Sequence, residues 1–123
     1  MTRVLVVDDS EFLRGGLTAV LETAGMTVVG QCASGAGVLD AFRSGTPDVV
    51  LMDVSMPGVD GVEATRRLLA EAPAARVLIL TLTASAARGA LAAGASGCLL
   101  KDGDGQELVA AVRAAAGRYD RGM

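Results

Sequence analysis

The chain has no histidine, no tryptophan and only three aromatic residues, two Phe and one Tyr, among its 123 residues. Two cysteines, Cys32 and Cys98, lack CxxC or other metal-ligand spacing, so we expect buried thiols in a reducing compartment rather than a metal site. With so few aromatics, the core must be built from Val, Leu, Ala and Met. A flavin carrier, which needs stacking aromatics and a hydroxyl-rich phosphate loop, is therefore improbable.

Long apolar runs and an excess of positive charge are also missing. No stretch reaches membrane-spanning length, and the N-terminus lacks an export signal, so we expect a cytoplasmic protein that does not enter a membrane. A formal net charge of −3 argues against this segment holding nucleic acid or anionic lipid by itself. The length is that of one compact domain, and 51% hydrophobic residues suffice for a core.

Short apolar runs alternate with helical patterns along the chain. We expect strands over residues 3–8, 27–32, 48–53, 76–81 and 97–100, and helices over 11–24, 36–43, 60–71, 85–93 and from 104 onward. This alternation predicts an α/β fold with a doubly wound parallel sheet. The polar second strand suits an edge, which gives the strand order 2-1-3-4-5 with right-handed crossovers. Ligands of such sheets bind at the carboxyl ends of strands one and three.

Chemically active side chains follow these strand ends. Asp8 and Asp9 follow the first strand, Asp53 ends the third, Thr81 ends the fourth and Lys101 follows the fifth. Clustered carboxylates repel one another unless a cation intervenes, and oxygen-only ligands favour Mg²⁺. A phosphoryl group could then be transferred in line to Asp53, with Thr81 and Lys101 binding its oxygens.

Each of these residues has a simpler interpretation when it is taken alone. Asp8 and Asp9 could cap the following helix, Asp53 could be a solvated turn residue, Thr81 a strand former and Lys101 a surface lysine. The joint placement of all five favours a site. Four glycines read as turn residues, and none belongs to a phosphate-binding P-loop: Gly58, Gly61, Gly94 and Gly97.

Four motifs together resemble the response-regulator receiver domain of two-component systems: V-L-V-V-D-D, V-V-L-M-D-V-S-M-P-G-V-D-G, V-L-I-L-T and L-L-K-D. The resemblance implies a flavodoxin-like (CheY-like) fold with Asp53 as phosphoacceptor. It implies Asp9 and Asp53 as direct Mg²⁺ ligands, Asp8 acting through water, and the backbone carbonyl of Ser55 as a further ligand. Thr81 and Lys101 would contact the phosphoryl group.

The Lys-Asp ending and the preceding G-A-S-G are most similar to NarL/LuxR-type regulators. This implies that a sensor histidine kinase phosphorylates the domain. Phosphorylation would change its conformation and its association, with a homodimer possible, and would thereby control transcription. DNA would be bound only by a C-terminal helix-turn-helix domain outside this chain. Residues 1–117 would form the receiver, and 118–123 a tail or the start of a linker. The domain would be a phosphoacceptor switch and not an enzyme, apart from self-catalysed phosphorylation and dephosphorylation.

Two departures from the family pattern leave an alternative open. Cys98 stands where an aromatic reporter of phosphorylation is usual, and the segment 82–95 is slightly short and lacks acidic residues. Both lie on the face that normally signals, so a protein-interaction module that works without phosphorylation is the second hypothesis. A phosphatase of the haloacid-dehalogenase kind is improbable because the D-x-D motif is absent.

Overall fold

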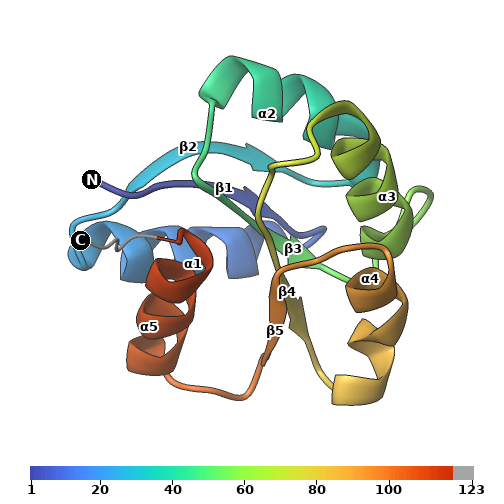
Figure 1. Cartoon of the computed structure of the whole chain (residues 1–123). Coiled ribbons are helices and arrows are strands. Elements are labelled where there is room, and N and C mark those ends of the chain that lie inside the picture. Colours follow the sequence, from blue (N-terminus) through green and yellow to red (C-terminus); the bar gives the residue numbers. More distant parts are fainter. Residues whose placement is uncertain (118–123) are drawn as a thin grey trace.

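The computed structural model describes residues 1–117, and the predicted tail or linker at 118–123 lies outside the described residues. Within that range a five-stranded sheet alternates with helices (Figure 1). The strands are β1 (Arg3–Val7), β2 (Thr27–Cys32), β3 (Val49–Asp53), β4 (Val77–Thr81) and β5 (Gly97–Leu100). The α-helices are α1 (Glu11–Thr23), α2 (Val38–Gly45), α3 (Gly61–Glu71), α4 (Arg88–Ala92) and α5 (Gly105–Ala115). Short 3₁₀ turns, η1 (Gly35–Gly37) and η2 (Ala84–Ala87), lead into α2 and α4.

All strand pairings are parallel, and the order is β2-β1-β3-β4-β5, which confirms the predicted topology. The residues of β3 and β4 are buried throughout, as their uninterrupted apolar runs predicted. The more polar β2 lies at one edge. The chain therefore reverses its winding between β1 and β3, and the carboxyl ends of these two strands adjoin.

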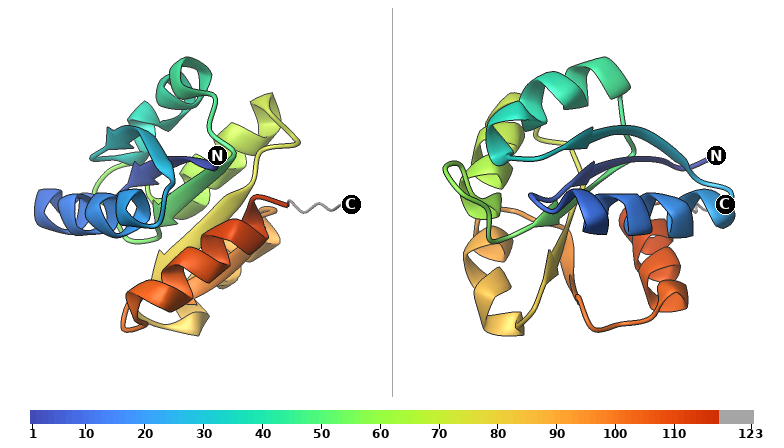
Figure 2. Two further views of the ribbon diagram at one scale, coloured as in Figure 1. Left: turned by 90° about the vertical axis from the view of Figure 1, so that its left-hand side faces the viewer. Right: turned by 180° about the vertical axis from the view of Figure 1, so that it is seen from behind.

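Helices cover both faces of the sheet (Figure 2). Leu17 and Leu21 of α1 and Leu108 and Val112 of α5 pack on one face with the β-strand residues that point toward them. On the other face, α2, α3 and α4 contribute residues such as Val38, Leu68 and Ala90. Aliphatic side chains dominate both cores, in agreement with the composition.

Side chains fix where the helices begin. Asp104 accepts a hydrogen bond from the Glu107 backbone N–H, and the Glu107 side chain accepts one from the Asp104 N–H, so α5 begins with a complete capping box. At α3 only the first half forms, with Asp60 accepting from the Glu63 N–H. The Glu63 carboxylate instead pairs with Arg67 and Arg66 along the helix, and these hydrogen bonds lower its pKa.

The prediction that both thiols are buried is wrong for Cys98. Cys32 is buried, whereas Cys98 is exposed. The cause is the position of β5 at the sheet edge, where Cys98 and Leu100 are exposed while Gly97 and Leu99 are half-buried. The helix α4 that flanks this edge spans only five residues.

No helix in the described part of the chain combines the length and apolar character that a bilayer crossing needs.

Candidate functional site

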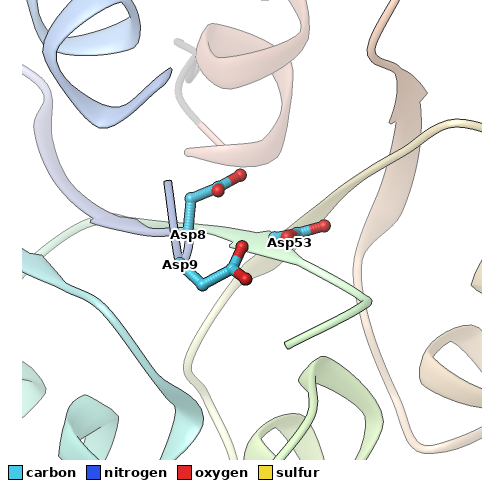
Figure 3. Close-up of side chains that lie close together, drawn as sticks. All are labelled: Asp8, Asp9 and Asp53. Carbon is cyan, nitrogen blue, oxygen red and sulfur yellow. The ribbon is translucent and has the colours of Figure 1, made fainter. Parts of the chain in front are cut away.

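Three carboxylates from two strand ends converge on one edge of the sheet (Figure 3). Asp8 and Asp9 follow β1, and Asp53 is the last residue of the adjacent β3. One carboxylate oxygen from each lies within 4.8 Å of the other two. Asp8 and Asp53 are buried, while Asp9 is exposed. The structure thus brings together the three acids that the sequence placed at the strand ends.

Backbone contacts hold the turn that carries Asp8 and Asp9. The Asp8 N–H continues the β1–β2 ladder by donating to the Cys32 carbonyl at 3.0 Å. One Asp8 carboxylate oxygen, Oδ1, accepts from the Ser10 N–H at 2.9 Å. The Asp8 carbonyl accepts from Arg14 Nη1 at 2.7 Å. Every polar group of the Asp8 backbone is therefore fixed, and the carboxylate keeps its other oxygen for a second partner.

That second partner is Lys101. Its Nζ lies 3.3 Å from Asp8 Oδ2 and 3.1 Å from Asp53 Oδ1. Desolvation alone would lower the pKa of Lys101, but the hydrogen bond and charge of Asp53, together with Asp8, raise it overall. Lys101 therefore stays charged and pairs with both buried carboxylates.

The carboxylate of Asp53 is less well compensated. Burial raises its pKa, the Lys101 hydrogen bond opposes this, and the nearby Asp8 charge raises it again. The net direction is upward from the usual 3.8. One ammonium shared between two buried acids leaves excess negative charge, which a divalent cation would relieve.

Thr81 and Lys101 line a hollow of about 350 Å³ together with Asp9, Asp53 and Ser55. The Thr81 hydroxyl donates to the Thr83 carbonyl at 3.2 Å, and the Thr81 carbonyl accepts from the Lys101 N–H at 2.7 Å. The Ser55 N–H donates to Asp53 Oδ1 at 3.3 Å. All six residues predicted from the sequence thus lie around the acids or along this hollow.

The prediction that Gly61 is a turn residue is wrong. It is the first residue of α3 rather than a turn, and it donates its N–H to the Val54 carbonyl at 2.8 Å. A Cβ at Gly61 would fall on the carbonyl oxygen of Asp53 and lie 2.8 Å from Val54 Cα. Close packing of α3 against the end of β3 explains this glycine. Gly97, inside β5, is likewise no turn, whereas Gly58 and Gly94 have positive φ and are.

The donor set fits a hard divalent cation. Three carboxylate oxygens converge, and no histidine exists in the chain to favour a softer metal. Among the described residues the two thiols contribute nothing to this cluster. The arrangement can hold Mg²⁺ beside a carboxylate whose environment also contains an ammonium and a hydroxyl.

The sequence model of the response regulator receiver domain family matches residues 4–113, nearly the whole of the described chain. The chain belongs to this family. Its receiver fold and its place among two-component response regulators agree with the resemblance that the four motifs indicated.

Curated relatives narrow the subfamily. The chain is 42% identical over 116 residues to the response regulator GacA of Pseudomonas aeruginosa, covering 92% of this chain and 54% of the relative. It is 40% identical over 116 residues to the response regulator UvrY of Escherichia coli, covering 92% of this chain and 53% of the relative. The chain therefore spans about half the length of these relatives.

Solved structures agree. A LuxR-family response regulator of Aurantimonas sp. SI85-9A1 superposes with a TM-score of 0.89 at 39% identity, covering 96% of this chain and 87% of that one. The receiver domain of NarL from Mycobacterium tuberculosis gives 0.88 at 35% identity, covering 96% and 98%. This receiver is thus of the LuxR/NarL type, a subfamily associated with transcription regulation.

Proposed function

We propose that this receiver accepts a phosphoryl group on Asp53 from the phosphohistidine of a sensor histidine kinase, in a reaction that requires Mg²⁺. The observation that carries the proposal is the convergence of Asp8, Asp9 and Asp53 beside Lys101. Asp9, Asp53 and the Ser55 carbonyl would hold the ion directly, with Asp8 acting through water. When bound, the ion would supply positive charge to the oxygens of the incoming phosphoryl group.

In this reaction an Asp53 carboxylate oxygen attacks the phosphorus, the new O–P bond forms, and the P–N bond to the donor histidine breaks. The product is an acyl phosphate, and the histidine leaves with the electron pair of that bond. Lys101 already contacts Asp53 Oδ1 and needs only a small movement to follow the added charge. Positioning and electrostatics do the catalytic work, so the domain serves as a phosphoacceptor switch rather than an enzyme acting on other substrates.

Thr81 connects the chemistry to a conformational change. Its hydroxyl now donates to the Thr83 carbonyl, and it must leave this acceptor to donate to a phosphoryl oxygen. Breaking that bond frees the segment 82–83 that leads into η2 and α4. The phosphoryl group would thus bias an equilibrium between two arrangements of this segment.

The output of the switch follows by analogy with the longer relatives. Association into a homodimer and DNA binding by a C-terminal helix-turn-helix domain are the expected results in a cytoplasmic regulator. A protein-glutamate methylesterase of Halobacterium salinarum also matches, at 41% identity over 128 residues, 94% of this chain and 37% of the relative. A similar receiver thus also occurs in a relative that is named as an enzyme. The proposed DNA-binding output therefore depends on the similarity to GacA, UvrY and the LuxR-type structures, and not on the receiver domain alone.

The test is phosphorylation by acetyl phosphate, followed by intact mass. The protein should gain one phosphoryl group with Mg²⁺ and none with excess EDTA. Asp53→Asn should gain none under either condition, and Asp48→Asn, which changes an acid at the opposite end of β3, should behave as wild type. A gain that survives Asp53→Asn, or no gain on wild type, contradicts the proposal.

The same samples test the alternative of a phosphorylation-independent module, which the comparisons do not favour. If phosphorylation occurs, the switch hypothesis expects self-association or partner binding to differ between phosphorylated and unphosphorylated protein. Equal behaviour of wild type and Asp53→Ala, with and without acetyl phosphate, would favour the constitutive module.

A further inference from the structure

Arg14 is a half-buried cation of α1 that reaches back toward the acid cluster. Its Nη1 donates to the backbone carbonyl of Asp8 at 2.7 Å, and its Nε donates to the side-chain Oε1 of Gln31 at 3.2 Å. Gln31 belongs to the edge strand β2, where it pairs in register with Val6. One guanidinium therefore connects α1, β2 and the turn that follows β1.

Arg14 contacts the acids only through their backbone. Within residues 1–117 it forms no ion pair with any carboxylate, in contrast to Lys101, which pairs with both Asp8 and Asp53. An arginine paired with Asp9 would compete with a metal for that carboxylate. By using a carbonyl and an amide oxygen as acceptors, Arg14 leaves the metal-binding oxygens free.

The carbonyl that Arg14 holds belongs to the peptide that joins Asp8 to Asp9. Fixing this carbonyl fixes the plane of the peptide, and this plane contains the backbone nitrogen and the Cα atom of Asp9. No hydrogen bond to the Asp9 carboxylate occurs within the described range, and the residue is exposed. The place of the Asp9 carboxylate therefore depends on the backbone that carries it, and Arg14 holds that backbone at the preceding carbonyl.

We propose that Arg14 is a positioning residue of the Mg²⁺ site, which orients Asp9 by clamping the Asp8 carbonyl, with Gln31 orienting Arg14. The inference rests on the proposed function, because it concerns the same metal. Groups that orient metal ligands without touching the metal typically change its affinity by about 10- to 100-fold. The planar guanidinium reaches its two acceptors through two different nitrogens, Nη1 and Nε, whereas a lysine offers a single nitrogen.

Charge and positioning make opposite predictions for Arg14, and this allows a sharp test. Removing a cation beside a metal site should tighten Mg²⁺ binding if electrostatics alone matters. We expect this for Lys101→Met, which removes an ammonium 3.1 Å from Asp53 Oδ1. For Arg14→Met we expect the reverse, a weakening of Mg²⁺ binding by about tenfold.

The experiment is a calorimetric titration of each folded variant with MgCl₂. Arg14→Lys keeps the charge but not the fork and should also weaken binding, while Gln31→Ala should produce a smaller loss. Arg67→Met, on α3 and paired with Glu63, is the matched control and should bind as wild type does. Urea unfolding in EDTA checks that each variant is folded, and Gln31→Ala, on an exposed residue, keeps the test open if Arg14→Met does not fold.

If wild type binds Mg²⁺ and both Arg14→Met and Arg14→Lys bind it equally well or more tightly, the positioning role of Arg14 is overturned. The proposed function is not affected by that result. If wild type itself binds no Mg²⁺, the proposed function fails and the assignment fails with it. A loss on Arg14→Met together with a gain on Lys101→Met supports positioning, because charge alone cannot give the two signs.

Discussion

Burial and the Asp8 charge make the ionised form of Asp53 less favourable in the folded chain than in water, although the proposed phosphoryl transfer needs that form. Lys101 offsets part of the effect, but it is shared with Asp8. Functional carboxylates of this kind commonly lower the stability of the protein that carries them. At the scale of single residues, the site is therefore a local weakness that a bound cation would relieve.

We expect Asp53→Asn to raise the free energy of unfolding of the metal-free protein by about 1 kcal/mol. Asparagine keeps the shape of the side chain and removes a charge that is desolvated by burial and repelled by Asp8. Urea unfolding in EDTA measures the change, and saturating Mg²⁺ should reduce or reverse the difference because the ion stabilises only the wild-type site. A less stable Asp53→Asn protein in EDTA would contradict the conclusion that the ionised Asp53 carboxylate destabilises the metal-free fold.

The same effect depends on pH in a defined direction. Because the pKa of Asp53 is raised in the folded state, the folded chain binds this proton more tightly than the unfolded chain does. The contribution of Asp53 to wild-type stability should therefore fall as the pH rises from the usual value of 3.8 through the folded-state pKa. The advantage of Asp53→Asn should be full above that window and vanish below it. An advantage that stays constant across this range would argue against Asp53 as its source.

Lys101→Met should slow phosphorylation by acetyl phosphate by about 100-fold, because it removes a cation placed to stabilise charge on the transferred group. The rate is followed by intact mass over time at saturating Mg²⁺. Arg113→Met, which removes a cation that donates to the Ala24 carbonyl away from the acids, is the control. An unchanged rate for Lys101→Met would remove Lys101 from the reaction.

At the scale of elements, all five strands and their parallel arrangement were predictable from the sequence. The reason is that apolar runs and the helical period of the segments between them are local properties. Asp104 and Glu107 formed a complete capping box. Glu63 did not, because Arg66 and Arg67 lie one turn further along α3 and compete for its carboxylate. Cys98 was placed wrongly because burial at a sheet edge depends on the length of the neighbouring helix.

Gly61 shows what local patterns could not reveal. Its small size matters only because α3 packs against the end of β3, a contact set by the tertiary structure. Arg14 escaped prediction for a similar reason, since its acceptors are a backbone carbonyl and a residue of another strand. The candidate site residues were predictable because they lie at the ends of strands. The residues that position them, such as Arg14 and Gly61, were not.

Gly61→Ala should therefore destabilise the protein by about 1–3 kcal/mol, because the added methyl group meets the Asp53 and Val54 backbone. It should also slow phosphorylation by displacing Asp53. Gly15→Ala, in the open interior of α1, is the matched control and should stabilise by about 0.5–1 kcal/mol. Urea unfolding checks both signs. A neutral or stabilising Gly61→Ala would contradict the packing argument.

At the scale of the whole molecule, the doubly wound sheet gathers groups that are up to 93 residues apart in the sequence, as the Lys101–Asp8 pair illustrates. Its 2-1-3-4-5 order places β1 beside β3 and so creates the acid cluster. The same order puts β5 at an edge next to α4. A movement of Thr81 at the end of β4 can therefore alter an exposed surface of the molecule.

Phosphorylation should consequently change amide hydrogen exchange most strongly in residues 82–95 and in β5. The reason is that the Thr81–Thr83 hydrogen bond must break before Thr81 can donate to the phosphoryl group. Thr81→Ala should still be phosphorylated but should show a much smaller exchange response. A response confined to α1 and α2, or an equal response in Thr81→Ala, would contradict this route.

Whether Asp53 is the phosphoacceptor is tested most directly by identifying the residue that carries the acyl phosphate. The protein is treated with acetyl phosphate and Mg²⁺, reduced with borohydride, digested and mapped by mass spectrometry. Reduction of an aspartyl phosphate releases phosphate and leaves homoserine in place of the aspartate. The account predicts homoserine at position 53, formed only when Mg²⁺ is present. Homoserine at another position, or its absence from a protein that has gained a phosphoryl group, would contradict it.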